Sequence, residues 1–430
     1  MKHFYQVLAN TLIANVTTSF LWFALVFWIY LETKSVLATG IIGGAYMLLL
    51  ALFSLVFGTV VDRHKKKSIF VFSSIFTLIA FVIASIIYMF QAEALLNVSS
   101  PMLWIFAGVI LVGAVVENMR NIALSTTVTL LVPKDKRANA NGLVGTVSGI
   151  GFIVTSVFSG LSIGLLGMGW TLVIAVALTT LALGHIYFVD IPEKDVMHDP
   201  ELANKKVDIR GSIAAISAVP GLFALLIFST FNNFIGGVYM ALMDPYGLTL
   251  FSVEMWGIVF GVAGTGFVIG GILVAKFGLG KNPIRTLLRL AIVMGLLGAF
   301  FTIREWWWLF GLGIWLYMAL VPAIEAAEQT VIQRVVPYKR QGRVFGFAAA
   351  FESAAAPITA FIIAPIAEFF IIPYANSEIG AKHLEPLLGT GEARGIALVF
   401  LVAGLIMALA AAVAFATKSY RKLSASYSEA

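Results

Sequence analysis

Long apolar runs with few or no charged residues occupy most of this sequence, and they constrain its fold more than any other feature. A helix needs roughly 20 mainly apolar residues to cross the hydrocarbon core of a membrane. Eleven runs reach that length, and the longest, over 138–189, is broken in two by the glycine-rich stretch 164–169. Twelve transmembrane helices are therefore predicted, over 3–31, 35–61, 68–92, 101–131, two within 138–189, 211–243, 255–275, 284–303, 306–330, 344–371 and 395–417.

The composition excludes the main classes of water-soluble protein. Only 12% of the 430 residues are charged, whereas soluble domains carry about 25%. A soluble enzyme and a disordered chain are excluded, and the lack of cysteine excludes a disulfide-stabilised secreted scaffold. The runs are long and do not alternate, so they predict helices rather than barrel strands. The predicted fold class is an all-α polytopic membrane protein.

The positive charges predict how the chain is oriented. If the N-terminus lies inside, 23 of the 28 Lys and Arg residues fall in inner segments, four fall in outer loops, and Arg120 lies within a span. Cytoplasmic loops of multi-pass proteins carry such an excess of basic residues. Both termini are therefore predicted to be cytoplasmic, with the chain in the cell (inner) membrane. The first span has no small-residue cleavage site and is interpreted as a retained helix.

Two stretches at equivalent places indicate an internal duplication. Thr126-x5-Val132-Pro133-x8-Gly142 joins the fourth and fifth spans, and Thr330-x5-Val336-Pro337-x8-Gly346 joins the tenth and eleventh with identical spacing. The pattern predicts two pseudo-symmetric six-helix bundles, 1–189 and 211–417, with a polar cytoplasmic linker over 190–210 and a cytoplasmic tail over 418–430. Parallel repeats of this kind are typical of alternating-access transporters, whose substrate site lies between the halves near the midplane.

The basic loop after the second span carries a resemblance to a known family. Its sequence, Gly58-Thr59-Val60-Val61-Asp62-Arg63-His64-Lys65-Lys66-Lys67, is similar to the loop between the second and third helices of the major facilitator superfamily. Thr33-Lys34-Ser35 and Val132-Pro133 with Ala138-Asn139-Ala140 resemble more narrowly its drug and macrolide efflux branch, which includes siderophore exporters. The resemblance covers the whole chain and implies the twelve-helix fold of that superfamily. Two positions depart from the pattern: Lys65 stands where a glycine is usual, and the stretch 155–160 lacks the proline of the antiporter signature.

The same resemblance implies a gating role for Gly58, Asp62 and Arg63. It places Asp62 at the start of the eleventh span when the inner side is closed, where the helix N-terminus stabilises an anion. Breaking such a contact on inward opening biases a two-state equilibrium. The alternative is a solvated basic loop that only follows the charge rule, which is how Lys65, Lys66 and Lys67 are interpreted.

Ionisable residues inside the spans are candidates for proton coupling, because a charge within the bilayer is costly and is usually functional. Glu117 and Arg120 lie three residues apart and so share a helix face, as do Glu325 and Glu328. Two neighbouring carboxyl groups such as Glu325 and Glu328 resist being ionised together. The alternatives are a structural ion pair within the fourth span, and pairing of Glu328 with Arg334 or Arg343. The candidates are Glu117, Arg120, Glu325, Glu328 and Glu352.

Polar and aromatic stripes at helical spacing in the first and seventh spans are candidates for lining a substrate cavity. Facing stripes of this kind suit a bulky amphiphilic ligand, and hydrogen bonding between helices by Asn and Ser is the structural alternative. The candidates are Asn15, Ser19 and Trp22 of the first span, Asn232, Asn233, Tyr239 and Met240 of the seventh, and Asn118 of the fourth span.

Other chemistry has no support in the sequence. There is no Walker loop, and the five histidines are scattered without metal-ligand spacing. We therefore expect a transporter rather than an enzyme, a monomer without cofactor, metal or nucleic-acid partner, which acts on a small molecule and interacts with protons and membrane lipid. The predicted function is proton-coupled export of drug-like or macrolide-like amphiphiles by alternating access. A siderophore-type exporter or a lipid translocase on the same fold, and an integral-membrane enzyme, are the alternatives.

Overall fold

The computed structural model describes residues 2–33, 36–193, 209–251, 253–389 and 393–429. Over these ranges the chain is helical and forms no β-strand. Most of the predicted linker, residues 194–208, lies outside the described residues, and so do Lys34 and Ser35 of the predicted family motif. The predicted domain boundaries at 189 and 211 stay a prediction.

The helices of the described ranges provide the predicted number of membrane crossings. Eleven of them are long and apolar enough to span a bilayer, and one of these, Lys134–Phe188, has 55 residues. A helix of that length would measure about 80 Å, far more than the roughly 30 Å of hydrocarbon. Within it Gly167 adopts φ 76° and ψ 175°, a conformation that only glycine takes readily. The chain therefore turns at Gly167, inside the predicted break at 164–169, and the stretch supplies two crossings.

The helices form two compact units, each of which is completed by a segment from the other half of the sequence. Unit 1 comprises residues 1–134, 150–213 and 337–350, and unit 2 comprises 135–149, 214–336 and 351–430. The helix α6 (Arg137–Phe188) therefore begins in unit 2, and α12 (Tyr338–Ile366) begins in unit 1.

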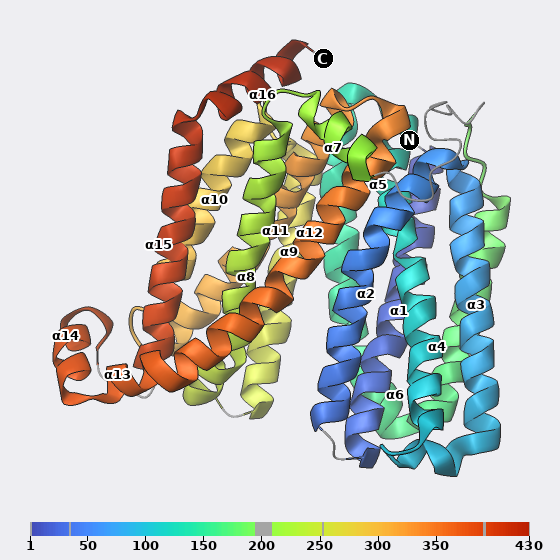
Figure 1. Cartoon of the computed structure of the whole chain (residues 1–430), viewed down its shortest axis with the longest axis horizontal. Coiled ribbons are helices and arrows are strands. Elements are labelled where there is room, and N and C mark those ends of the chain that lie inside the picture. Colours follow the sequence, from blue (N-terminus) through green and yellow to red (C-terminus); the bar gives the residue numbers. More distant parts are fainter. Residues whose placement is uncertain (1, 34–35, 194–208, 252, 390–392, 430) are drawn as a thin grey trace. The chain divides into compact units, whose positions relative to one another are not determined.

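Unit 1 is built around α1 (Lys2–Thr33), α2 (Val36–Arg63), α3 (Lys66–Gln91), α4 (Pro101–Glu117) and α5 (Met119–Leu131), with most of α6 and a 3-10 turn at Ala92–Leu96 (Figure 1). Another 3-10 turn, Lys134–Lys136, precedes α6. The Ser100 hydroxyl accepts a hydrogen bond from the Met102 N–H and Pro101 occupies the first turn, a combination that starts a helix. Buried Leu25, Trp28 and Phe106 belong to the apolar core that α1, α3, α4 and α6 share.

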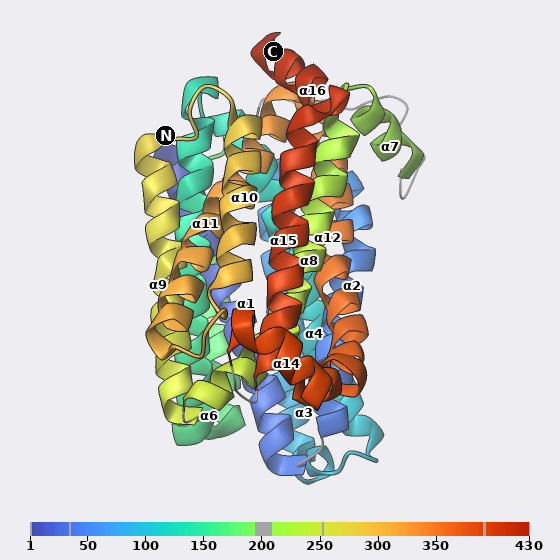
Figure 2. The ribbon, with the colours of Figure 1, turned by 90° about the vertical axis from the view of Figure 1, so that its left-hand side faces the viewer.

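Unit 2 contains α8 (Leu222–Leu250), α9 (Val253–Phe277), α10 (Pro283–Phe300), α11 (Trp307–Val335) and α15 (Arg394–Ala416), together with the rest of α12. Figure 2 shows α10 beside α15, with α8 on the far side of α15. Gly295 of α10 and Gly404 of α15 face each other, and such small residues let helix backbones approach closely in a membrane. An aromatic cluster of Tyr239, Tyr246, Phe301, Phe310 and Phe400 fills the core, with ring centroids 4.7–6.1 Å apart.

Three stretches differ from the predicted spans. The predicted span 211–243 is a short helix, α7 (Ile209–Ser217), followed by α8, because Gly221 takes φ 88° between them. The helix α12 continues through a π-helical turn (Ala367–Ile371) into α13 (Ile372–Asn376), which α14 (Glu378–Leu388) follows. The predicted tail forms α16 (Lys418–Glu429), which buries Leu423 and Tyr427.

Candidate functional site

A buried polar cluster in unit 1 surrounds the Glu117–Arg120 pair. Glu117 ends α4 and Arg120 lies in the first turn of α5, so the two side chains share one face across the short break at Asn118. The Arg120 Nε donates to Glu117 Oε1 at 2.5 Å. Arg120 is fully buried and Glu117 is 2% exposed. The predicted pair therefore forms, away from solvent.

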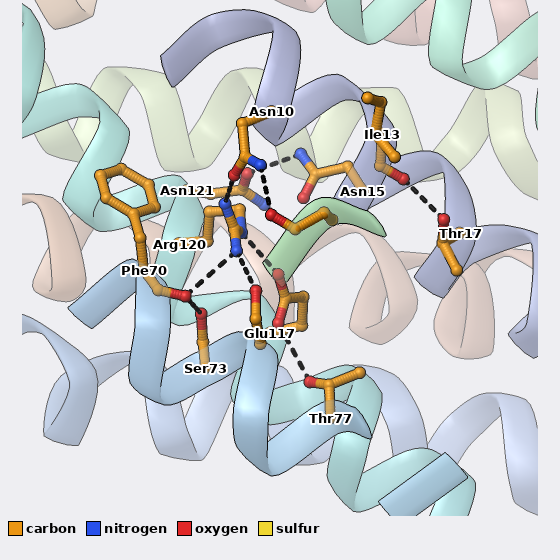
Figure 3. A network of polar contacts seen from close by, with 12 residues as sticks. Asn10, Ile13, Asn15, Thr17, Phe70, Ser73, Thr77, Glu117, Arg120 and Asn121 are labelled. Atoms are coloured by element: carbon orange, nitrogen blue, oxygen red, sulfur yellow. Dashed lines mark hydrogen bonds and ion pairs between the residues drawn. The ribbon is translucent and has the colours of Figure 1, made fainter. Parts of the chain in front are cut away.

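The remaining donors of Arg120 bind acceptors on two other helices (Figure 3). Nη1 donates to Asn10 Oδ1 of α1 at 2.5 Å, and Nη2 donates to Ser74 Oγ at 2.5 Å and to the Phe70 carbonyl oxygen of α3 at 3.2 Å. The Phe70 ring also lies beneath the guanidinium, 5.1 Å from Cζ. A guanidinium is a rigid planar donor, so its acceptors hold α1, α3, α4 and α5 in one arrangement.

The cluster extends from Glu117 and Asn10 to further helices. Thr77 Oγ1 of α3 lies 3.0 Å from Glu117 Oε2. Asn10 Nδ2 donates to the Ala182 carbonyl oxygen of α6 at 2.7 Å and lies 3.2 Å from His185 Nδ1. The Glu117 charge is thus compensated by Arg120 and solvated by a hydroxyl, so the pair as a whole is neutral. Asn10, Ser74 and Thr77 are not among the residues predicted from the sequence, because isolated polar residues in a span are common and the partners of these three lie far along the chain.

A second ionisable cluster lies in unit 2 and has a different character. Glu325 and Glu328 of α11 interact electrostatically with Glu352 of α12, and Glu328 is also close to the Ser229 hydroxyl of α8. Glu328 is 8% exposed, Glu352 is half-buried and Glu325 is exposed. The Oε1 atoms of Glu328 and Glu352 are buried and accept no hydrogen bond from the described residues.

No basic side chain in the described part of the chain forms an ion pair with these three carboxyl groups. The partners that the sequence suggested are engaged elsewhere. The Arg334 guanidinium lies 4.5 Å from the centroid of the Tyr427 ring of α16, and Arg343 pairs with Asp62. The unit 2 cluster is therefore acidic without a compensating charge, whereas the unit 1 pair is neutral.

The predicted gating residues lie where α2 meets the beginning of α12, within unit 1. The Asp62 carboxylate accepts hydrogen bonds from the Gly342 N–H at 2.6 Å, the Arg343 N–H at 2.9 Å and the Arg343 Nε at 3.3 Å. These groups directly precede Val344, where the eleventh span was predicted to begin. Asp62 is 5% exposed, so the solvated-loop alternative does not describe it. Arg63 ends α2 and is half-buried.

Gly58 allows this contact because it has no side chain. A Cβ atom built on Gly58 would lie 2.5 Å from the Gly342 carbonyl oxygen and 3.0 Å from the Gly346 Cα. Real Cβ atoms essentially never show the first distance, and the second is tighter than most Cβ contacts, so the lack of a side chain at Gly58 lets α2 and α12 approach this closely. Gly346, which also lies at this contact, is the last residue of the repeated motif Thr330-x5-Val336-Pro337-x8-Gly346.

The predicted cavity residues fall into groups with different surroundings. Asn15 Nδ2 donates to Asn121 Oδ1 at 2.8 Å and Asn121 Nδ2 donates to Asn118 Oδ1 at 2.7 Å, so these amides bond between helices as the structural alternative describes. Ser19 and Trp22 are half-buried on α1, and the Trp22 ring lies 4.8 Å from that of Tyr46.

On α8 the candidates point to different sides of the helix. Asn232 and Asn233 are half-buried, and Asn233 Nδ2 donates to the Ser229 carbonyl oxygen at 3.0 Å. Tyr239 is 2% exposed inside the aromatic cluster, where its hydroxyl donates to the Phe400 carbonyl oxygen at 3.3 Å. Met240 is 63% exposed. Their roles in binding substrate stay predictions.

Comparison with known proteins identifies the family. Residues 7–360 match the family model described as the Major Facilitator Superfamily, which covers most of the 430 residues. The chain belongs to the Major Facilitator Superfamily. The resemblance carried by the loop at 58–67 is thereby confirmed, and the chain is a multi-pass membrane transporter of a superfamily whose members bind small-molecule substrates.

Solved structures of other transporters share the fold of this superfamily member. A bacterial homologue of the iron transporter ferroportin in its outward-facing state is 14% identical with a TM-score of 0.68, covering 99% of this chain and 100% of that one. A proton:xylose symporter is 12% identical with a TM-score of 0.68 and 99% coverage of both chains. A human organic anion transporter is 13% identical with a TM-score of 0.66, covering 94% of this chain and 99% of that one. The predicted fold class is confirmed.

Two curated relatives of this chain share one name. Macrolide efflux protein A of Streptococcus pyogenes is 23% identical over 403 residues, which are 90% of this chain and 92% of that protein. The protein of the same name from Enterococcus faecalis is 23% identical over 324 residues, 72% of this chain and 94% of that protein.

Proposed function

We propose that this transporter exports an amphiphilic small molecule of macrolide-like character across the cell membrane in exchange for protons. The observation that carries the proposal is the acidic cluster of Glu325, Glu328 and Glu352 in unit 2, which has no basic partner among the described residues. Both termini are proposed to be cytoplasmic, on the asymmetry of the basic residues.

The contrast between the two ionisable clusters supports the proton part of the proposal. An uncompensated carboxylate is costly to bury in a membrane protein. Glu328 and Glu352 each hold a buried oxygen without a hydrogen-bond donor, and a proton bound at either carboxyl group removes that cost. In unit 1 Arg120 already compensates Glu117, so proton uptake there would leave an unpaired guanidinium. We therefore assign proton exchange to unit 2 and a positioning role to the unit 1 pair.

The substrate class is supported by the names of the curated relatives and by the residues predicted to line a cavity. Both relatives are named for macrolide efflux and match most of the chain. Half-buried Asn232 and Asn233 of α8 supply amide groups in unit 2, which suit the few polar points of a ligand that is apolar over most of its area.

The experiment measures accumulation of a radiolabelled macrolide in cells that express the full chain, with and without an uncoupler of the proton gradient. We expect expression to lower accumulation and the uncoupler to abolish the effect. Glu328→Gln and Glu352→Gln should each reduce efflux at least about tenfold, equivalent to about 1.4 kcal/mol. The matched control is Glu368→Gln, because Glu368 is an exposed carboxylate later on the same helical stretch as Glu352.

The outcomes separate the parts of the proposal. Efflux that persists with the uncoupler, or that survives both substitutions, contradicts proton exchange at unit 2. Unchanged macrolide accumulation, with uncoupler-sensitive efflux of another compound from a broad panel, contradicts the substrate class alone.

A further inference from the structure

The five residues after α6 form a short, anchored segment rather than a loose connection. Val189 is 2% exposed and Ile191 is 6% exposed, so apolar side chains attach the segment to unit 1. The Glu193 N–H donates to the Ile191 carbonyl oxygen at 2.8 Å, which closes a three-residue turn around Pro192. The ring of proline restricts φ to a value that suits such a turn. The turn at Pro192 and the buried side chains of Val189 and Ile191 therefore fix the position of Glu193.

The Glu193 carboxylate binds groups from two other helices. Oε2 accepts the Lys66 N–H at the beginning of α3 at 2.7 Å, and Oε1 accepts the Tyr338 hydroxyl at the beginning of α12 at 2.9 Å. The Lys66 Nζ lies 3.5 Å from Oε1, and the side chains of Lys66 and Glu193 are 4% and 5% exposed. All three residues belong to unit 1.

Lys66 ties this contact to the end of α2. Its Nζ donates to the Val61 carbonyl oxygen at 2.8 Å and to the His64 carbonyl oxygen at 3.2 Å, and it lies 5.2 Å from the centroid of the Tyr338 ring. A cation at the C-terminal end of one helix and an anion at the N-terminal end of the next are both favourable placements. Lys66 is thus a structural member of the loop rather than a solvated charge, contrary to its interpretation from the sequence.

We propose that Glu193 is a second anionic anchor for the beginning of α12, beside Asp62, and that residues 189–193 act as a latch on the helix. Asp62 holds α12 through Gly342 and Arg343, and Glu193 holds it one turn earlier through Tyr338. The proposal rests on the proposed function only in that α12 must leave unit 1 during an alternating-access cycle. Residues 189–193, which begin the connection between the two halves of the sequence, then stabilise the contact of α12 with unit 1 that the cycle must break.

The absence of cysteine from the chain makes a direct test simple. Val344 lies in the latched part of α12 and is fully buried, so a single Val344→Cys reporter reacts with a maleimide only when this part of α12 opens. We would measure the labelling rate of the detergent-solubilised full chain carrying this reporter. It would be compared with the same chain carrying Glu193→Gln, Tyr338→Phe or, as the matched control, Asp190→Asn, which removes an exposed charge from the start of the same segment.

We expect Glu193→Gln to raise the labelling rate about tenfold or more, since a hydrogen bond to a charged group is typically worth at least about 1.5 kcal/mol and about 1.4 kcal/mol is a factor of ten. Tyr338→Phe should raise it by a comparable factor, because the Tyr338 hydroxyl is the group through which Glu193 holds α12. Asp190→Asn should stay within about twofold of the parent. These expectations follow from the contacts to Lys66 and Tyr338 alone.

Parent-like labelling of a folded Glu193→Gln chain overturns the latch, as does an equal rise with Asp190→Asn. If Glu193→Gln does not fold, Tyr338→Phe decides the matter, because it removes only one hydroxyl group; a parent-like rate then overturns the proposal. The measurement needs neither substrate nor a proton gradient, so failure of the proposed export function leaves its result unaffected, and the reverse also holds.

Discussion

Replacing Arg120 by methionine removes the charge at the centre of the unit 1 polar cluster while keeping an unbranched side chain. The change leaves the Glu117 carboxylate buried, with the Thr77 hydroxyl as its remaining side-chain neighbour among the contacts described above. It also removes the donors from Asn10, Ser74 and the Phe70 carbonyl oxygen. Breaking a buried ion pair by removing one partner costs about 3–5 kcal/mol, because the other charge is left uncompensated.

The expected change in melting temperature follows from this free-energy cost and the number of residues in unit 1. Unit 1 has roughly 200 residues, and in domains of that size each kcal/mol lowers the melting temperature by about 2–4 °C. We therefore expect Arg120→Met to lower the melting temperature of unit 1 by about 6–20 °C. The nine tryptophans supply the fluorescence signal for a thermal melt of the solubilised protein.

The double variant distinguishes charge compensation from simple loss of contacts. Glu117→Gln combined with Arg120→Met has no uncompensated charge, so its loss should be smaller than the sum of the two single losses, by about 0.5–3 kcal/mol. Arg120→Lys keeps the charge but loses the planar donor geometry, and should fall between the parent and Arg120→Met. The reasoning is refuted if the two single effects simply add, or if Arg120→Met melts within about 2 °C of the parent.

Substitutions at two further positions, Gly58 and Tyr239, test the contacts described for those residues. Gly58→Ala should displace the beginning of α12 and destabilise the chain by about 1–3 kcal/mol, which would appear as faster labelling of the Val344→Cys reporter; Gly44→Ala on the same helix has open space around its Cβ and should label like the parent. Tyr239→Phe should cost about 0.5–1.5 kcal/mol for one hydrogen bond, and Tyr239→Ala about 3–5 kcal/mol for the emptied aromatic core, in the same thermal melts. Equal losses for the two Tyr239 variants would contradict the placement of that ring.

The membrane class and the spans could be predicted from the sequence because they depend on local quantities. The length of an apolar run, the break at 164–169 and the balance of basic residues each involve neighbours along the chain. One exception lies in the apolar run 211–243, where α7 ends at Ser217 and Gly221, in a left-handed conformation, precedes α8. The Pro220-Gly221 pair is a turn signal at this point, but the span prediction rested on the length of the apolar run alone.

The sequence alone determined which residues could be paired within one helix, and the tertiary structure decided what lies opposite them. Glu117 and Arg120 are three residues apart, and because Asn118 between α4 and α5 keeps a helical conformation, this spacing brings their side chains together. Asn10, Ser74 and the Phe70 carbonyl oxygen meet Arg120 only because α1, α3 and α5 pack at particular rotations, and Glu193 reaches Lys66 across 127 positions of sequence. Contacts between helices depend on the summed packing of many side chains, which no short stretch of sequence contains, and for that reason the network around each charge emerges only from the folded chain.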